Sequence, residues 1–551
     1  MFTLVLLTLV TTASTQEYPE VTTPLGQILG TTLITRLNKT IYAFRGIRYA
    51  QPPIKNLRFQ PPVPVEPWSG TYDATTDGPV CPQPSDDPIS EDCLVLNVYT
   101  TKLPDNSTNP KRPVIMHLHP GGFYSATGRS NWGGPQYLLD QDIVLVTLNY
   151  RLGSLGFIST GEDAPGNNGL KDQVMAMRWI QDNIESFGGD SESVTLYGYS
   201  AGAWSITLHL VSPMSRGLFH KAIIGSGSAL GHWPLSTNQL ELAQKQAEIV
   251  GCPVVDPQIM LTCLRSIPAE VLGNSLSEFA EFGDAPVLIW SPVIEEDFGQ
   301  ERFLSDHPIN LIESGEFEHV PVVIGVTKDE FANLVFPLVA NASLLQALSD
   351  NFEVYAPVCL IYERNTEKSK EVSAAARTFY LGDEPLSNAS LPGLANLFAD
   401  SVVGFPVHRA ANLIAEKNSE PVYFYEFTYQ GRYSHFYLPD SNGTVPYGVV
   451  HHDDLIYLFY ISAIFPYFDE TYPEIEMVEK LSLLWANFAK TGNPTPDSNP
   501  LFADTKWEKY NITDRKYLEI GKDLVLRDSL YAERYDFWEH LFPDFCISDC
   551  K

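Results

Sequence analysis

The chain has 551 residues and a formal net charge of −31 at pH 7. Hydrophobic residues make up 44% of it and aromatic residues 12%, so a large core can form and a mostly disordered chain is excluded. The negative charge argues against nucleic acids and anionic membranes as partners. It fits a secreted soluble protein but identifies no substrate.

The N-terminal residues predict export. An apolar run at 2–10 is followed by small residues at 11–15, which is typical of a signal peptide and too short for a membrane span. We therefore expect a signal peptide at 1–15 and one mature α/β domain at 16–551. The last residues do not resemble a lipid-anchor signal, so no membrane anchor is expected. Six N-x-[ST] sequons predict glycosylation of an exported chain: Asn38, Asn106, Asn341, Asn388, Asn442 and Asn511.

Strand-like apolar runs alternate with helical patterns along the chain. The runs expected to form buried strands lie at 114–118, 143–148, 193–197, 222–224, 322–326 and 422–427. Helices are expected at 169–187, at 203–208 and around 477–488, where Gly492 can cap the last of them. No repeat or linker interrupts this alternation. The fold class predicted is therefore α/β, with a large central, mostly parallel sheet flanked by helices.

The cysteines fit an oxidising compartment. Seven are present, and four of them form two pairs that would each close a short loop: Cys81 with Cys93, and Cys252 with Cys263. The odd number implies a free thiol or an intermolecular bridge among the others: Cys359, Cys546 and Cys550. No Cys or His cluster has metal-site spacing, so no metal and no cofactor are expected.

The most informative motif is the pentapeptide Gly198-Tyr199-Ser200-Ala201-Gly202, which lies between a strand-forming run and a helix-compatible one. G-x-S-x-G in this context is the nucleophile elbow of an α/β-hydrolase. The turn is so tight that only small residues fit beside the serine, hence the two glycines. The helix that follows directs its N-terminal amides toward a developing oxyanion. Ser200 is therefore the candidate nucleophile.

A serine hydroxyl needs a general base, normally histidine, and a carboxylate that fixes the imidazole tautomer. In α/β-hydrolases the chain order is serine, acid, histidine. Asp329 and Glu330 follow the strand at 322–326, at the sheet edge where such sites form, and this reasoning does not separate them. The candidate base lies in the loop at 448–454. The histidines that remain after the acid are His408, His435, His451, His452 and His540.

An oxyanion hole needs backbone N–H groups aimed at one point. The segment 119–123, His-Pro-Gly-Gly-Phe, directly follows the strand at 114–118, as the H-G-G-G motif does in esterases. Gly121 and Gly122 can turn their amides inward. Together with the amide of Ala201 they make three candidate donors.

Beyond these motifs, the chain resembles the type-B carboxylesterases, a family that includes cholinesterases, juvenile hormone esterases and bile-salt lipases. The resemblance covers nearly the whole mature chain and is strongest to secreted insect esterases. Besides the elbow, it is carried by the stretches 44–47, 91–99, 149–153, 164–167, 187–190, 217–219, 226–228 and 448–451. It implies an α/β-hydrolase fold and a secreted enzyme that hydrolyses small carboxylic esters through an acyl-enzyme.

The resemblance also assigns residues. It implies Ser200 as nucleophile, Glu330 as the acid and His451 as the base. It implies both disulfides named above. It further implies two structural ion pairs: Arg45 with Glu91, and Arg151 with Asp172.

The sequence departs from the family pattern at several positions. Pro120 replaces the first motif glycine, but that position is not one of the family's oxyanion donors. His452 replaces the glycine that usually follows the catalytic histidine, where it could change the loop geometry or compete as base. Tyr199 stands where cholinesterases carry glutamate, and the loop from Cys81 to Cys93 contains no tryptophan. We therefore expect neutral esters to be preferred to choline esters.

Two alternatives to general ester hydrolysis follow from the resemblance. One is a juvenile-hormone-type esterase. The other is a non-catalytic adhesion or scaffold relative, of the kind that has lost the serine or the histidine. This chain retains Ser200, Glu330 and His451, which favours the enzyme. The oligomeric state is not predicted.

Overall fold

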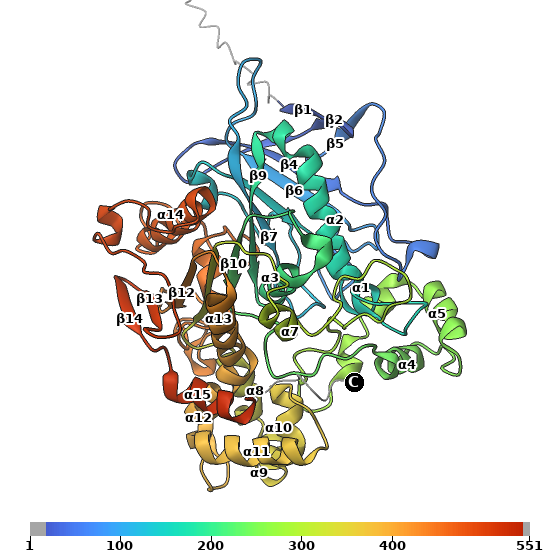
Figure 1. Ribbon diagram of the computed structural model, residues 1–551, viewed down its shortest axis with the longest axis vertical. Coiled ribbons are helices and arrows are strands. Elements are labelled where there is room, and N and C mark those ends of the chain that lie inside the picture. The colour runs from blue at the N-terminus through green and yellow to red at the C-terminus, as the bar shows by residue number, and fades with distance from the viewer. Residues whose placement is uncertain (1–17, 544–551) are drawn as a thin grey trace, which may run out of the picture.

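An eleven-stranded mixed sheet forms the centre of the computed structural model, which describes residues 18–543 (Figure 1). The predicted signal peptide, Cys546 and Cys550 lie outside this range. Neighbouring strands are parallel from β13 to β8 in the order given below and antiparallel at both edges. The spatial order is β14 (Leu524–Asp528), β13 (Lys516–Ile520), β12 (Val422–Phe427), β11 (Val322–Thr327), β10 (Lys221–Gly225), β9 (Gly189–Tyr199), β7 (Arg112–Leu118), β8 (Val144–Leu148), β6 (Val95–Thr100), β4 (Thr40–Arg48) and β3 (Thr31–Ile34).

Side chains alternate between the two faces of the parallel strands, and each face has its own core. Helices α2 (Asn168–Asn183), α3 (Ala201–Val211) and α13 (Phe405–Lys417) pack with one face, and α14 (Ile475–Thr491) packs with the other. Leu196 and Ile224 belong to the first core, and their chain neighbours Tyr197 and Ile223 belong to the second. Full burial of such side chains contributes roughly 1.5–3 kcal/mol each. These strands are buried on both faces, which is why they read as continuous apolar runs.

All six predicted strands are present, and the predicted fold class is confirmed. The helix expected at 169–187 is α2 followed by a 3₁₀ turn at Ile184–Phe187, and Gly492 caps α14 in a left-handed conformation (φ 73°). The sequence did not predict a separate three-stranded sheet of β1 (Glu20–Thr23), β2 (Gly26–Leu29) and β5 (Thr71–Asp73). These strands are short and partly exposed, so they lack a long apolar run.

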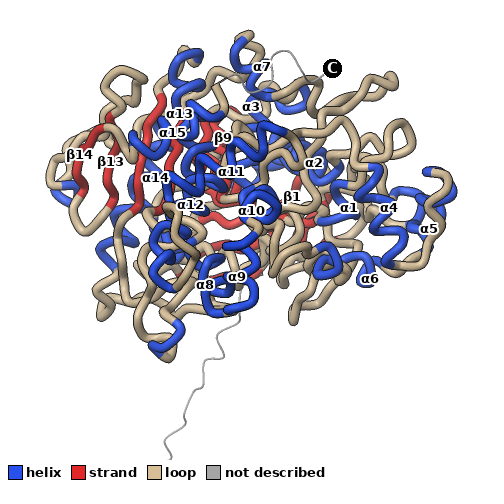
Figure 2. The backbone as a smooth tube through the Cα atoms, turned by 90° about the horizontal axis from the view of Figure 1, so that it is seen from below, coloured by secondary structure: helices blue, strands red, loops and turns tan. Residues whose placement is uncertain are grey.

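Two helical insertions follow strands β10 and β11, and Figure 2 shows helices of the first to the right of the strand layer and helices of the second below and across it. The first contains α4 (Leu240–Ile249), α5 (Pro257–Ser266), α6 (Ala269–Gly273) and α7 (Pro308–Glu313). The second contains α8 (Val335–Ala340), α9 (Ala342–Asp350), α10 (Phe352–Leu360), α11 (Glu367–Tyr380), α12 (Leu391–Ala399) and a π-helical turn at Asp400–Gly404. Two further helices are α1 (Gly153–Phe157) and α15 (Ala532–Leu541). Over residues 18–543 no single helix is long and apolar enough to cross a membrane, although one pair bent by 102°, Ala332–Ala340 with Ala342–Asp350, passes that test jointly.

The structure contains both implied disulfides, Cys81–Cys93 and Cys252–Cys263. Cys359, in α10, is a buried free thiol, and burial raises its pKa to about 12. The thiolate is the reactive form of cysteine, so this side chain is inert at neutral pH.

The Arg151–Asp172 ion pair is present and almost completely buried. Arg151 donates to Asp172 from Nε at 2.8 Å and from Nη2 at 2.6 Å, and its backbone N–H donates to the same carboxylate at 3.0 Å. This bidentate arrangement satisfies both carboxylate oxygens, as a buried charge pair requires.

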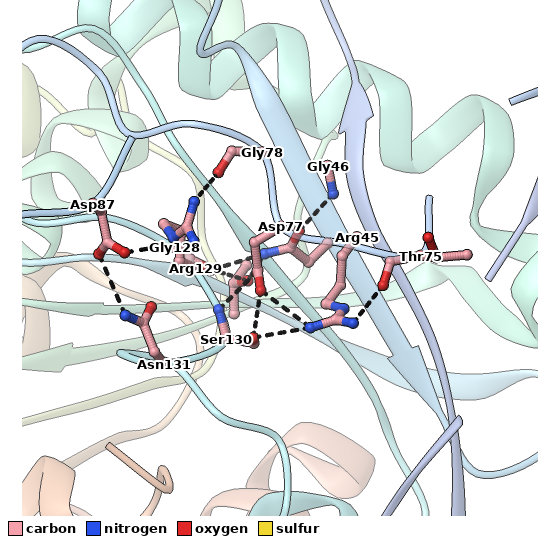
Figure 3. A network of polar contacts seen from close by, with 12 residues as sticks. Arg45, Gly46, Thr75, Asp77, Gly78, Asp87, Gly128, Arg129, Ser130 and Asn131 are labelled. Carbon is pink, nitrogen blue, oxygen red and sulfur yellow. Dashed lines mark hydrogen bonds and ion pairs between the residues drawn. The ribbon is translucent and has the colours of Figure 1, made fainter. Parts of the chain in front are cut away.

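The implied Arg45–Glu91 pair is wrong. Arg45 contacts Asp77 at 3.1 Å, with Ser130 and the carbonyl of Thr75 as further acceptors (Figure 3). Glu91 is instead held by Arg58. Arg45 lies where the register between β4 and β6 shifts, between Phe44 and Ile47. A β-bulge of this kind re-aims a side chain, and nothing in the sequence marked it.

Candidate active site

Ser200 lies at the sharp turn between β9 and α3, where it has φ 54° and ψ −119°. Its backbone N–H donates to the carbonyl of Gly225 at 2.9 Å. A Cβ atom on Gly198 would lie 2.3 Å from the carbonyl of Gly202, and one on Gly202 would lie 2.0 Å from the carbonyl oxygen of Leu118. Both glycines are therefore required by close backbone contacts. The strained backbone of Ser200 is typical of a functional turn and leaves its side chain lining a cavity.

A buried histidine–carboxylate pair lies beside the same cavity, and the histidine, His451, lines it. His451 Nδ1 lies 2.5 Å from Glu330 Oε2, and Oε1 of Glu330 accepts the N–H of Thr327 at 2.8 Å. The ring of Phe331 stacks on the imidazole at 4.1 Å. Because the carboxylate accepts, Nδ1 carries the hydrogen and Nε2 has a free lone pair. That Nε2 atom is buried and has no hydrogen-bond partner.

Asp329 has a different position from Glu330. Its carboxylate accepts the N–H of Val449 at 2.8 Å, and its own N–H donates to the carbonyl of Val449 at 2.9 Å. A Cβ atom on Gly448 would lie 2.3 Å from Asp329 Oδ2. Asp329 therefore ties the loop that carries His451 to the end of β11. Local sequence reasoning left both acids open, the family resemblance implied Glu330, and the structure brings Glu330 to the imidazole.

His452 adopts a left-handed conformation with φ 82°. Glycine adopts this conformation without steric cost because it has no Cβ atom, which explains why the family usually has glycine at this position. Its backbone N–H donates to the hydroxyl of Tyr199 at 3.0 Å. Its ring lies 4.3 Å from that of His451, and no carboxylate bonds to it in the described residues. Burial, followed by the nearby His451 and His435, lowers the pKa of His452 well below its usual value.

The glycine loop after β7 has the backbone that its sequence requires. Gly121 and Gly122 have φ 107° and 58°, and the carbonyl of Gly121 accepts the N–H groups of Tyr124 and Ser125 at 3.0 and 2.9 Å. The carbonyl of Pro120 accepts from Nδ1 of His119 at 2.8 Å. Proline thus replaces the first motif glycine without disturbing the two that follow. Gly121, Gly122 and Ala201 line the same cavity as Ser200 and His451.

This cavity has a volume of about 180 Å³ and a largely apolar wall. The stacked pair Trp204 and Trp233, with ring centroids 4.4 Å apart, forms one part of the wall. The π-helical turn contributes Val402 and Val403. Such turns recur at functional sites. Sequence reasoning did not assign these residues to the site, because none of them belongs to a motif. Trp204 lies in α3 just after the elbow, whereas Trp233, Val402 and Val403 come from the insertions after β10 and β11.

A larger chamber of about 670 Å³ adjoins the first cavity, with Gly121, Ser125 and His452 common to both. The Cys81–Cys93 loop and Trp132, which is 39% exposed, form part of its wall. Trp132 supplies an aromatic face near that loop which the sequence could not locate. Tyr199 lines neither cavity. The preference for neutral over choline esters stays a prediction.

Four histidines line this chamber: His117, His119, His435 and His452. Within residues 18–543, no group of three or more His, Cys, Asp or Glu side chains has the geometry to hold a metal ion. The sequence analysis named three of these residues: His119 and His452 through the motifs that contain them, and His435 among the histidines left as candidate bases.

Buried histidines also predict a pH dependence of stability, for which His209 is a clean test. Its Nε2 lies 2.8 Å from Gln173 Oε1 and its Nδ1 lies 2.7 Å from Ser215 Oγ, and burial lowers its pKa to about 3. An unfolded histidine titrates near 6.5, so below that pH the unfolded state binds the additional proton. The free energy of unfolding therefore decreases as the pH decreases below about 6.5, by at most about 1.4 kcal/mol per pH unit for this group.

We expect the His209→Gln variant, which keeps a donor and an acceptor, to lose less thermal stability than the parent protein as the pH falls from about 7 to about 5. The measurement is the melting temperature of both proteins across this range. Parallel curves would contradict a neutral His209 in the folded state.

The mixed α/β sheet, the serine turn and the buried Glu330–His451 pair define the class of α/β-hydrolases. The carboxylesterase family model matches residues 17–538, and this chain belongs to that family. Membership of this family, together with the similarity to esterases described next, identifies the chain as an ester hydrolase.

Several relatives are named esterases. The chain is 39% identical to esterase FE4 of Myzus persicae, with 89% of this chain and 87% of that protein aligned. It is 37% identical to juvenile hormone esterase of Tribolium castaneum, with 97% and 96% aligned. The crystal structure of juvenile hormone esterase from Manduca sexta, with OTFP covalently attached, is similar with a TM-score of 0.85 and 27% identity, covering 96% of this chain and 100% of that one.

Proposed function

We propose that this protein is a secreted carboxylic ester hydrolase that works through an acyl-enzyme, with Ser200 as nucleophile, His451 as general base and Glu330 as its carboxylate partner. The observation that carries the proposal is the Nδ1 contact of His451 with Glu330 at 2.5 Å, which leaves Nε2 unpartnered beside the cavity that Ser200 lines. These three residues can carry out nucleophilic catalysis, because an imidazole fixed in this tautomer can accept the serine proton.

The reaction has two steps. Nε2 of His451 takes the proton of Ser200 as Oγ attacks the ester carbonyl, and the backbone N–H groups of Gly121, Gly122 and Ala201 stabilise the oxyanion. The alcohol leaves with the proton from His451. His451 then takes a proton from a water molecule as this water attacks the acyl carbonyl, and the carboxylic acid leaves as Ser200 Oγ takes the proton back from His451. The proposed mechanism uses no metal and no cofactor. A fluorophosphonate probe tests it, because the probe should label one serine, Ser200, on the folded protein.

We expect Glu330→Gln to lower kcat/KM by about 10³-fold or more, because an amide cannot stabilise the imidazolium and favours the wrong tautomer. Asp329→Asn should cost far less, since the amide oxygen can still accept the N–H of Val449. Steady-state kinetics on a simple acetate ester checks both. Equal losses would leave the acid unassigned.

Export and glycosylation are supported by the surface positions of the sequons. All six asparagines are exposed: Asn38, Asn106, Asn341, Asn388, Asn442 and Asn511. We expect the mature protein, 16–551, to form one domain, to begin near residue 16 and to lose mass on enzymatic deglycosylation. Intact-mass and peptide mass spectrometry of the protein from insect cells measures both. An intact Met1 with unmodified asparagines would refute export.

Juvenile hormone hydrolysis is the second candidate. It is favoured by the 37% identity to the Tribolium castaneum juvenile hormone esterase and by the structural similarity to the Manduca sexta enzyme. Fold similarity alone does not choose a substrate. The deciding measurement is kcat/KM for juvenile hormone against a panel of esters that vary in acyl length and alcohol size. A clear preference for the hormone would support this candidate, and comparable turnover of the panel would support general ester hydrolysis.

A further inference from the structure

A rear cavity lies behind the apolar wall of the smaller cavity. Its volume is about 460 Å³. Among the described residues, three line both this rear cavity and the cavity of Ser200: Trp204, Trp233 and Leu288. Within the same range no residue lines both the rear cavity and the larger chamber. The three apolar side chains therefore form a partition between the reacting centre and a separate space.

The rear cavity is open to solvent and partly apolar. Its lining includes polar residues that are exposed on the surface: Ser236, Glu241, Glu363 and Arg364. It also includes apolar residues: Leu235, Pro357 and Ile361. An alkyl chain in this space would bury apolar surface against the second group, and its end would reach water.

Trp204 is the member of the partition that lies next to the nucleophile on α3. Its backbone N–H donates to the carbonyl of Ser200 at 2.8 Å, one helical turn earlier. Its ring stacks on that of Trp233 at 4.4 Å with an interplanar angle of 27°, and it meets the ring of the buried Phe123 edge-on at 5.8 Å. Close packing against two other rings fixes the indole in place, so the partition is part of the packed core.

The volume of the smaller cavity limits what can bind beside Ser200. Its volume of about 180 Å³ is below the roughly 300–1,000 Å³ that is typical of small-molecule sites, whereas the larger chamber has about 670 Å³. The two spaces meet at Gly121, Ser125 and His452. An ester has two arms that diverge from its carbonyl carbon, so it can place one arm in each space. The arm in the smaller cavity has to be short, because the partition closes that cavity toward the rear.

We propose that Trp204 sets the length of the ester arm that the smaller cavity accepts, because its ring separates this cavity from the rear cavity. The inference rests on the proposed function, since it places the arm relative to Ser200. It deepens that function by naming a substrate class: esters with one short apolar arm and a larger second arm that occupies the larger chamber. Without the indole ring the smaller cavity joins the rear cavity, and a long alkyl arm can extend through the opening.

The test uses two pairs of esters in which one arm is a bulky aromatic group suited to the larger chamber. 2-Naphthyl butyrate and 2-naphthyl octanoate vary the acyl arm, and butyl and octyl phenylacetate vary the alcohol arm. The measured quantity is the long-to-short ratio of kcat/KM within each pair. We expect the parent protein to give a ratio of about one-tenth or less in at least one pair, because an apolar pocket rejects even one surplus methylene by roughly tenfold or more. That pair identifies the arm that the smaller cavity binds.

Two variants of Trp204 assign the limit to the partition. Trp204→Ala should raise the long-to-short ratio of that pair by about tenfold or more, because it joins the two cavities that the indole lines. Trp204→Phe keeps a ring against Trp233 and should raise the ratio less, by about threefold. The matched control is Val403→Ala, which enlarges the smaller cavity at a wall that the rear cavity does not share, and it should leave the ratio within about twofold.

Ratios near one for both pairs in the parent, or ratios that neither Trp204 variant raises, would overturn the inference. So would a rise in Val403→Ala as large as that in Trp204→Ala, because cavity volume alone would then set the limit. If thermal unfolding shows that Trp204→Ala does not fold, the ratio of Trp204→Phe decides. Labelling of Ser200 by a small fluorophosphonate separates this result from a failure of the proposed function. A labelled parent without a length limit contradicts only the role of Trp204, whereas an unlabelled parent contradicts the esterase mechanism.

Discussion

Replacing Ser200 by alanine is expected to lower ester hydrolysis by on the order of 10⁴-fold or more, while the protein remains folded. The turn holds the hydroxyl at the start of α3 and beside the cavity, and the acyl-enzyme cannot form without it. Steady-state kinetics measures the loss, and covalent labelling by an organophosphate should disappear in the same variant. The melting temperature should stay close to that of the parent, because the hydroxyl of Ser200 makes no hydrogen bond within residues 18–543.

A second serine of the same cavity provides the control. Ser228 also lines it, but its hydroxyl accepts the backbone N–H of Leu230 at 3.0 Å. Ser228→Ala should therefore keep labelling and most of the activity. If Ser200→Ala kept activity within tenfold of the parent, the nucleophile would have to be assigned elsewhere.

Replacing His451 by alanine is expected to be nearly as damaging as losing the serine. The variant removes the group that accepts the serine proton and leaves the carboxylate of Glu330 buried without its imidazole. We expect kcat to fall by on the order of 10⁴-fold or more. Single-turnover acylation with a chromogenic ester measures the step directly, because it is the first step that needs the base.

The neighbouring histidine gives a matched control at the next position. His452→Gly should retain activity within about tenfold, since glycine adopts φ 82° without strain and its N–H can still donate to Tyr199. The ring of His452 has no bonded carboxylate, so it lacks the partner that a base requires. An inactive His452→Gly together with an active His451→Ala would show that the base had been assigned one residue too early.

Local sequence patterns predicted the elements that place the reacting groups. The strands of the parallel region are buried on both faces, so each appears in the sequence as a short apolar run. The elbow was predictable for a similar reason, because Gly198 and Gly202 meet other backbone atoms at distances that no side chain permits. The short strands β1, β2 and β5, which form the separate small sheet, were missed, since their partial exposure leaves no apolar pattern to detect.

Local sequence patterns were not sufficient to assign the catalytic acid or the ion pairs. Asp329 and Glu330 are adjacent and chemically alike, and their roles separate only because Asp329 contacts the backbone of Val449 while Glu330 reaches His451. Arg45 was paired with the wrong acid because the bulge in β4 turns its side chain toward Asp77. Both outcomes depend on the direction of a side chain in space.

By itself the sequence determined the fold class, the elbow and the glycine loop, because these depend on short-range backbone geometry and on burial that residue types record directly. Local pattern did not separate Asp329 from Glu330, for which the family resemblance was needed, and only the tertiary structure decided which residues form the two cavities. Each cavity combines residues from distant segments that share no motif: the smaller contains Trp204 and Val402, and the larger contains His117 and His435. These residues become neighbours only when the topology of the sheet brings their strands and insertions to one edge. Long-range packing of this kind leaves no periodic or spacing signal in the chain.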